Sequence, residues 1–244
     1  MKPKILFVLC GNCRTFIDCF DSCYENIISS FVSPLEKYDI HLYLYLKLTD
    51  PGPKGQYDFD FTYKNVEKTA IMEKITEMQE KYPTGTIEYK ILQDNEISDT
   101  DIMSQVIDRT KYNGCFDRDS ILLRALHCHY NFECCGNYIL EKEARLDEQF
   151  RTIVYVRPDL YFVQKCEAID TYDSDIITLG EGPYVQNNDH LAVIPRKYLE
   201  AFFLDRMKVY RTNTETTFGS PEDVYWHTIP FEVKPIGKYY IKRP

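Results

Sequence analysis

Four cysteines near the start of the chain, Cys10, Cys13, Cys19 and Cys23, are close enough in sequence to suggest chemistry. Cys10 and Cys13 form a Cys-x-x-Cys pair just before a helical pattern, and a helix N-terminus lowers the pKa of such thiols in redox proteins. Cys19 and Cys23 are one helical turn apart, but a zinc site needs four converging ligands, and no second pair completes it. We therefore interpret these cysteines as small apolar side chains of the core.

The turn "GNCR" offers a different kind of site, one for a phosphate. In an open parallel sheet, ligands bind beyond the carboxyl ends of the strands, and this turn follows an apolar run at 4–9. Gly11 permits close approach of the backbone, and the N-terminus of the following helix favours anions. Arg14 has the reach to bind a phosphate, although a solvated surface charge explains it equally well.

A second candidate site lies in "TIVYVRPDLYF", where an apolar run stops at Arg157, Pro158 and Asp159. A charged pair directly after a buried strand suits a binding site better than a core. Asp159 could hold a divalent cation that bridges two phosphates, and Arg157 could neutralise a pyrophosphate. The competing interpretation is a simple turn, since proline and aspartate are common turn residues.

The surrounding pattern predicts the elements that position these residues. Apolar runs bounded by turn residues indicate strands, and amphipathic stretches indicate helices. Strands are expected at 4–9, 38–46, 86–92, within 150–164, at 174–179 and 190–195, and within 231–244; helices at 15–32, 64–82, 120–142 (one or two), 196–210 and near 220–229. This alternation predicts one α/β domain over residues 1–244, with a mixed, mostly parallel sheet and helices on both faces.

Composition narrows the class of protein. The net charge is −9 and no basic stripe is present, which argues against nucleic acid as the main partner. No apolar run is long enough for a membrane span. Nine irregularly spaced cysteines fit free thiols in a reducing compartment, so we expect a cytoplasmic location. The 20 tyrosines suit pockets that stack rings or sugars, or they are core material.

Several segments taken together resemble a known family. They are "FVLCGNCRTF", "YDIHLYLYL", "RDSILLRALHCHYNFE" leading into "IVYVRPDLYF", "NNDHLAVIPRKYLEAFF" and "SPEDVYWHTI". The chain resembles nucleotide-sugar glycosyltransferases of the GT-A kind, and among them polysaccharide-building transferases of bacteria and large DNA viruses. The resemblance implies a Rossmann-like GT-A fold, a nucleoside-diphosphate sugar as donor and a glycan or glycoprotein acceptor. It also implies a nucleotide-binding half at about 1–160 and an acceptor half at about 161–244.

The resemblance also implies roles for the donor site. Such enzymes carry Asp-x-Asp after a central strand to hold Mn²⁺ or Mg²⁺ on the donor diphosphate, whereas this chain has Arg-x-Asp. Asp159 is then the implied metal ligand, and His227 is placed by order to complete the shell. The nucleotide would lie against Gly11, Asn12, Arg14, Arg118, Arg157 and Asp159.

Further residues are implied on the acceptor side. Asp189 would bind a sugar hydroxyl, and Tyr184 would stack on a ring. An inverting transfer needs a general base, for which Glu222 and Asp223 are the candidates and His190 a lesser one. The first two also fit a plain helix start, where acidic residues are favoured.

Three rival functions remain open. A sugar nucleotidyltransferase would show a Gly-rich, basic loop after the first strand, which "GNCRTF" matches weakly. A thioredoxin-like oxidoreductase would use the Cys-x-x-Cys pair. A non-catalytic nucleotide- or carbohydrate-binding module would bind a donor without transferring it. The motif "HCH" at 127–129 is a poor metal pair, because residues two apart on a helix point in different directions.

Overall fold

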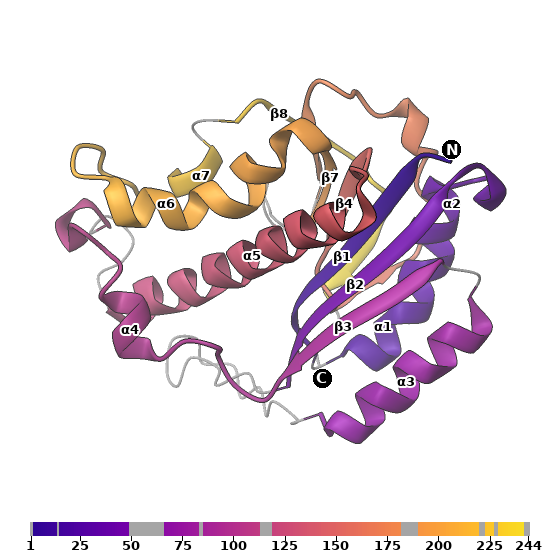
Figure 1. Ribbon diagram of the computed structural model, residues 1–244, viewed down its shortest axis with the longest axis horizontal. Coiled ribbons are helices and arrows are strands. Elements are labelled where there is room, and N and C mark those ends of the chain that lie inside the picture. Colours follow the sequence, from indigo (N-terminus) through magenta and orange to yellow (C-terminus); the bar gives the residue numbers. More distant parts are fainter. Residues whose placement is uncertain are drawn as a thin grey trace.

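The computed structural model describes residues 2–13, 15–48, 66–82, 85–112, 119–181, 190–219, 223–226 and 229–241. Strands and helices alternate through its first half (Figure 1). The strands are β1 (Lys4–Asn12), β2 (Asp39–Lys47), β3 (Thr86–Leu92), β4 (Thr152–Val156), β5 (Leu160–Phe162), β6 (Ile177–Gly180), β7 (Leu191–Pro195), β8 (Phe231–Lys234) and β9 (Tyr239–Ile241). The α-helices are α1 (Phe16–Cys23), α2 (Ser29–Phe31), α3 (Lys68–Lys81), α4 (Asp99–Met103), α5 (Asp119–Leu146), α6 (Asp205–Thr212) and α7 (Asp223–Trp226).

In the described part of the chain, seven strands form one sheet in the order β3-β2-β1-β4-β7-β6-β8. β1 pairs in parallel with both β2 and β4, and β2 pairs in parallel with β3. β7 runs antiparallel to β4 and β6, while β8 is parallel to β6. The predicted α/β class, with a mixed and mostly parallel sheet, is confirmed.

Helices cover both faces of this sheet, as the apolar pattern of β1 requires. Ile5, Phe7 and Leu9 point to the face covered by α1 and α3. Leu6 and Val8 point to the opposite face, which α5 crosses (Figure 1). Because successive side chains of a strand alternate, a strand that is apolar on both faces must be central, which is where β1 lies.

A third apolar cluster lies against the first half of α5. It joins α4, α6 and α7 to that helix through buried side chains, including Ile102, Leu126, Met207 and Val224. The second half of α5 packs on the sheet through Phe132, Cys135 and Ile139. The stretch 120–142, expected as one helix or two, is therefore a single helix shared by two cores.

Two predicted helices contain irregular turns, and the last stretch of the chain divides between two sheets. Residues 15–32 contain a π-helical turn at Tyr24–Ile28, and residues 196–210 begin with a 3₁₀ turn and a π-helical turn at Glu200–Leu204 before α6. The stretch 231–244 forms two strands that belong to different sheets, since β9 pairs with β5 rather than with the main sheet. In the first π turn, Asn26 O accepts a hydrogen bond from Cys166 N at 2.9 Å, which ties this turn to the segment after β5.

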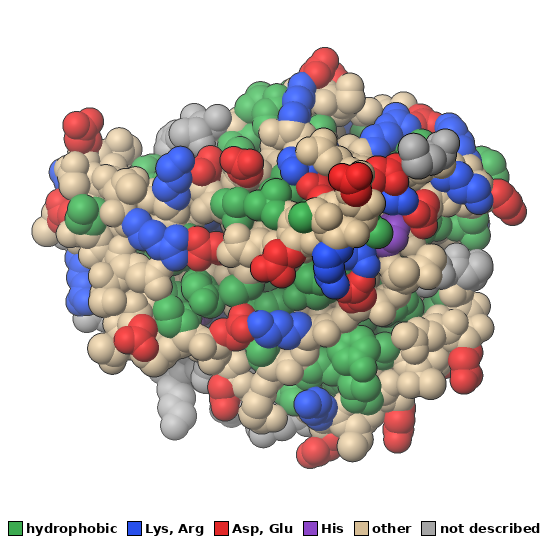
Figure 2. Space-filling view, in the orientation of Figure 1, with side chains coloured by type: hydrophobic (Ala, Val, Ile, Leu, Met, Phe, Trp, Pro, Cys, Tyr) green, Lys and Arg blue, Asp and Glu red, His purple; other side chains and the backbone are tan. Residues whose placement is uncertain are grey.

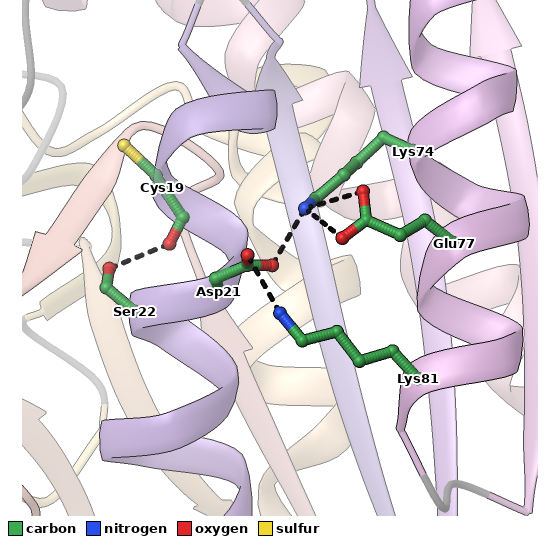
Figure 3. Close-up of polar contacts among 6 residues, drawn as sticks. All are labelled: Cys19, Asp21, Ser22, Lys74, Glu77 and Lys81. Carbon is green, nitrogen blue, oxygen red and sulfur yellow. Dashed lines mark hydrogen bonds and ion pairs between the residues drawn. The ribbon is translucent and has the colours of Figure 1, made fainter.

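An ionic cluster joins α1 to α3 (Figure 3). Lys74 on α3 is 7 % exposed, and its Nζ lies 2.8 Å from Asp21 Oδ1 on α1 and 3.1 Å from Glu77 Oε1. Lys81 Nζ lies 3.1 Å from Asp21 Oδ2. The cluster fixes the spacing of the two helices on their face of the sheet.

The surface over α5 shows no separation of charge among the side chains drawn in colour. Lys and Arg side chains alternate there with Asp and Glu, and apolar patches lie between them (Figure 2). Within the described residues, none of the helices combines the length and apolar character needed to cross a bilayer.

Candidate functional site

The strand order places a topological switch point between β1 and β4. From β1 the chain moves to β2 and then β3 on one side, and it returns through α5 to β4 on the other side of β1. Open α/β sheets bind ligands at such a switch point, beyond the carboxyl ends of the strands. The predicted residues Gly11 and Asn12 end β1, and Arg157 and Asp159 directly follow β4.

Gly11 lies close to Pro158, where the ends of β1 and β4 meet. Gly11 has φ of +145°, a conformation that residues with a side chain rarely adopt. A Cβ at this position would lie 3.2 Å from Pro158 Cδ. The structure therefore gives Gly11 a packing role, in which the close neighbour is the proline ring. Its role towards a nucleotide stays a prediction.

Arg157 and Asp159 form a bidentate ion pair. Arg157 Nε donates to Asp159 Oδ1 at 3.0 Å, and its Nη2 donates to Oδ2 at 2.8 Å. The Asp159 side chain is 2 % exposed and that of Arg157 is 25 % exposed. The buried carboxylate thus fixes the plane of a partly exposed guanidinium, a group that suits phosphate recognition.

This geometry does not fit the predicted Mn²⁺ or Mg²⁺ site. Both oxygens of Asp159 accept hydrogen bonds from Arg157, so a metal ion would have to displace the guanidinium. No group of three or more His, Cys, Asp or Glu side chains converges on one point among the residues that the structure describes. Hard cations prefer several oxygen ligands, and these residues supply one engaged carboxylate.

His190 lies beside Arg157, which the sequence alone did not indicate. Arg157 N donates to His190 O at 2.8 Å, extending the antiparallel pairing of β4 with β7 by one step. The His190 ring meets Tyr239 of β9 edge-on, with the ring centroids 6.4 Å apart. His190, which the sequence ranked below Glu222 and Asp223, therefore pairs through its backbone with Arg157.

The interpretation of the four early cysteines as core residues is confirmed. Cys10, Cys13, Cys19 and Cys23 are all buried. Burial raises the pKa of the Cys13 thiol to about 11, the opposite of what a redox-active thiol needs. All eight cysteines in the described residues are free thiols.

Asp223 is the one of the remaining predicted site residues that lies within the described part of the chain. Asp223 starts α7, which packs on α6, and its neighbour Val224 belongs to the third apolar cluster. The remaining ones lie outside the described residues: Arg14, Arg118, Tyr184, Asp189, Glu222 and His227. Their roles, like those of the placed residues, stay predictions.

The "HCH" motif behaves as the helix geometry predicts. His127 Nε2 lies 2.7 Å from Asp99 Oδ1 on α4. His129 is buried, and its ring lies 5.6 Å from that of Tyr210 on α6. The two imidazoles therefore meet different partners.

Sequence reasoning missed Lys47, the last residue of β2. It is 8 % exposed, and its Nζ donates to Asn95 Oδ1 at 2.7 Å in the segment after β3. The available signal was the one that identified Arg157, a charged residue that ends a strand with two apolar faces. The strand was predicted to end one residue earlier, at 46, which left Lys47 in the loop.

A carboxylate that the sequence did not single out lies next to Asn95. Glu96 accepts a hydrogen bond from Tyr45 Oη at 2.5 Å and another from Cys134 Sγ at 3.1 Å, and it pairs with Lys90. Burial acts to raise the pKa of Glu96, but the bonds from Lys90, Tyr45 and Cys134 outweigh it and hold that pKa below its ordinary value. Glu96 is thus an anchored anion at the same edge of the sheet.

Comparisons with known proteins show a distant structural likeness without a match in sequence. No family model matches the chain, and no curated protein matches its sequence. The solved structure of the glycosyltransferase GlyE from Streptococcus pneumoniae TIGR4 superposes with a TM-score of 0.40 and 9 % identity. The match covers 96 % of this chain and 45 % of that one, so this chain spans less than half the length of GlyE. A likeness at this distance does not indicate an activity.

Proposed function

We propose that this chain is a glycosyltransferase that moves a sugar from a nucleoside-diphosphate donor to a glycan hydroxyl. The observation that carries the proposal is the oriented Arg157 guanidinium, held by Asp159 at the switch point between β1 and β4. Glycosyl transfer from such a donor releases a nucleoside diphosphate, and a fixed cation stabilises the charge that develops on it. The sequence resemblance to GT-A transferases points to the same reaction.

The acceptor hydroxyl needs a general base if the transfer inverts the anomeric carbon. Glu222 and Asp223 are the bases proposed from sequence, and His190 is supported by its backbone contact with Arg157. Asp189 is proposed to bind a sugar hydroxyl. An inverting mechanism predicts that Glu222→Gln or His190→Asn removes turnover while donor affinity is kept.

The division into a donor half at about 1–160 and an acceptor half at about 161–244 belongs to this proposal. So does a cytoplasmic location, which the free thiols support. Because the described residues offer no ligand set for Mn²⁺ or Mg²⁺, no step of the proposed reaction is assigned to a metal.

The chain offers a matched pair of variants to test the assignment. Asp159→Asn removes the charge from a bidentate pair at the carboxyl edge. Glu143→Gln does the same at the opposite end of β4, where Arg196 Nε and Nη2 bind Glu143 at 2.7 Å each. In both pairs the carboxylate is buried, at 2 % and 7 % exposure.

The assay combines thermal shift with turnover, using a panel of nucleoside-diphosphate sugars with and without Mn²⁺. A donor that binds the folded state raises the melting temperature. We expect both variants to lose some stability, and only Asp159→Asn to lose donor binding and transfer. Equal turnover in the two variants would contradict the proposed site. Donor binding without any transfer would instead identify a non-catalytic module.

A further inference from the structure

We propose that the outer face of the β5–β9 sheet is a binding surface for a glycan chain, on which Tyr161 and Tyr240 stack against sugar rings. This inference deepens the function proposed above and rests on it, because the acceptor of that reaction is a glycan. The sequence assigned no role to either tyrosine. The two faces of this small sheet, its anchoring and its position support the proposal.

The β5–β9 sheet has one buried and one exposed face. Because side chains alternate along a strand, Tyr161 and Tyr240 point away from the core. They lie opposite each other in the strand register, with their ring centroids 5.4 Å apart. Tyr240 is 44 % exposed, and Val163, the next outward residue after Tyr161, is 53 % exposed. Three buried side chains point the other way, into the core beside α1: Leu160, Phe162 and Tyr239.

The small sheet is anchored to α1 and to the π turn that follows it. A pair of strands is marginally stable by itself in water, so it needs such support. Phe162 N donates to Ser22 Oγ at 3.1 Å, and Asn26 Nδ2 donates to Phe162 O at 3.2 Å. Val163 N donates to Lys238 O at 2.8 Å, which extends the pairing with β9 by one step. A surface that is ordered before binding loses less conformational entropy when a ligand binds.

The exposed rings lie close to the Arg157–Asp159 pair. Tyr161 comes two residues after Asp159, so their Cα atoms are at most about 7 Å apart. Tyr240 lies beside Tyr161 on the neighbouring strand. In the proposed reaction, the acceptor hydroxyl reaches the donor at this end of β4. A glycan whose terminal sugar lies there can continue over the two rings.

The size and chemistry of this face favour a glycan over a protein partner. Two strands of three residues give a face of about 10 Å by 10 Å, or about 100 Å². A stable protein interface buries about 800 Å² on each partner, which is several times as much. A sugar ring has an apolar face of C–H groups that stacks on the negative face of an aromatic ring, and its hydroxyls can bond to the polar tip of a tyrosine.

The alternative is a purely structural pair, since aromatic residues opposite each other stabilise two paired strands. Tyr89 is the matched control, because it is 42 % exposed and lies on β3, at one end of the strand order of the main sheet. Tyr240→Thr and Tyr89→Thr each replace an exposed tyrosine by a residue that suits a strand. Tyr240→Phe keeps the ring and removes only the hydroxyl.

The experiment screens the wild type against an array of oligosaccharides that includes maltohexaose, cellohexaose and chitohexaose. Isothermal titration calorimetry then measures the affinity for the bound oligosaccharide and for a nucleoside diphosphate. We expect Tyr240→Thr to weaken the oligosaccharide by at least about tenfold and to leave the nucleoside diphosphate unchanged. Tyr240→Phe should keep most of the affinity, and Tyr89→Thr should bind like the wild type.

Two results of this experiment would overturn the inference. One is unchanged oligosaccharide affinity in folded Tyr240→Thr. The other is a wild type that binds no member of the array at millimolar concentration. If Tyr240→Thr instead turns a dimer into a monomer in sedimentation, with oligosaccharide affinity kept, the occupant of this face is a second copy of the chain and the inference fails.

A second measurement covers the case in which Tyr240→Thr does not fold. In the wild type, the bound oligosaccharide should shift the amide resonances of 160–163 and 239–241 and leave those of 86–92 in place; the reverse pattern would overturn the inference. Sugar transfer with an unchanged acceptor KM in Tyr240→Thr would remove this surface and keep the proposed function. Tyr240-dependent oligosaccharide binding without any donor binding would keep the surface and remove the proposed transfer.

Discussion

Replacing Gly11 by alanine should lower the free energy of unfolding of the protein by an amount that follows from the local geometry. A residue with a side chain at φ of +145° costs about 1–3 kcal/mol in backbone strain. The new Cβ would lie 3.2 Å from Pro158 Cδ, and overpacking of this kind costs about 1–3 kcal/mol. The sum is about 2–6 kcal/mol. For a chain of 244 residues, a loss of about 4 kcal/mol lowers the melting temperature by about 8–16 °C.

A double-mutant cycle separates the two contributions. Pro158→Ala removes the ring that the new Cβ would meet, but it leaves the strain at residue 11 in place. We expect Gly11→Ala to cost about 1–3 kcal/mol less in the Pro158→Ala background than in the wild type. Denaturant unfolding of the four proteins measures the difference. A melting temperature of Gly11→Ala within about 2 °C of the wild type would refute the reasoning, and a coupling of zero would refute its steric part.

Three further predictions concern the cysteines and the α1–α3 contact. With a pKa of about 11, Cys13 should resist iodoacetamide at pH 8 in the folded protein and react after denaturation, as peptide mass spectrometry can show; rapid modification of the folded protein would contradict its burial. The double variant Cys10→Ser, Cys13→Ser should keep glycosyl transfer, and a loss of activity without unfolding would restore a redox or metal role. Burial acts to raise the pKa of Asp21, but bonds from Lys74 and other neighbours outweigh it and hold that pKa below its ordinary value. The stability that this carboxylate contributes is therefore present above pH 4 and is lost as the pH falls through its folded pKa. Since Asp21 is 39 % exposed, Asp21→Asn should cost less than about 1 kcal/mol at pH 7 and should flatten the decline of stability in acid; an unchanged acid profile would contradict the assignment.

The sequence predicted the central strands well because their physical signal is local. β1 and β4 are apolar on both faces, so their burial can be read from a few residues, and β4 ends at a charged residue followed by proline, as predicted. The end of β1 was predicted too early, since the strand continues from 9 through Gly11 to Asn12. The same signal located Arg157 and Asp159. The structure brings these residues to the same edge as Gly11, because β1 and β4 pair in parallel and their carboxyl ends meet. From the sequence, only the family resemblance grouped them.

Other features depend on contacts between distant parts of the chain. The pairing of β5 with β9 joins residues about 80 positions apart, and no local pattern distinguishes it from pairing with the main sheet. The π turn at Tyr24–Ile28 contains neither glycine nor proline that would mark it in the sequence. Within it, Asn26 O accepts a hydrogen bond from the distant Cys166 N. Lys47 carried a local signal as the charged end of β2, but its position opposite Asn12 depends on the strand register. That Pro158 would fill the space beside Gly11 could not be foreseen either.

The division of α5 between two apolar cores has a consequence for how the molecule opens. The helix has 28 residues, which corresponds to about 42 Å of continuous backbone. Its first half is protected by the small cluster with α4, α6 and α7, and its second half by the sheet. In native-state hydrogen exchange, the amides of 122–126 should therefore report the opening of the small cluster, and those of 132–139 the unfolding of the whole domain. Amide exchange along this one helix would then give two separate free energies of opening.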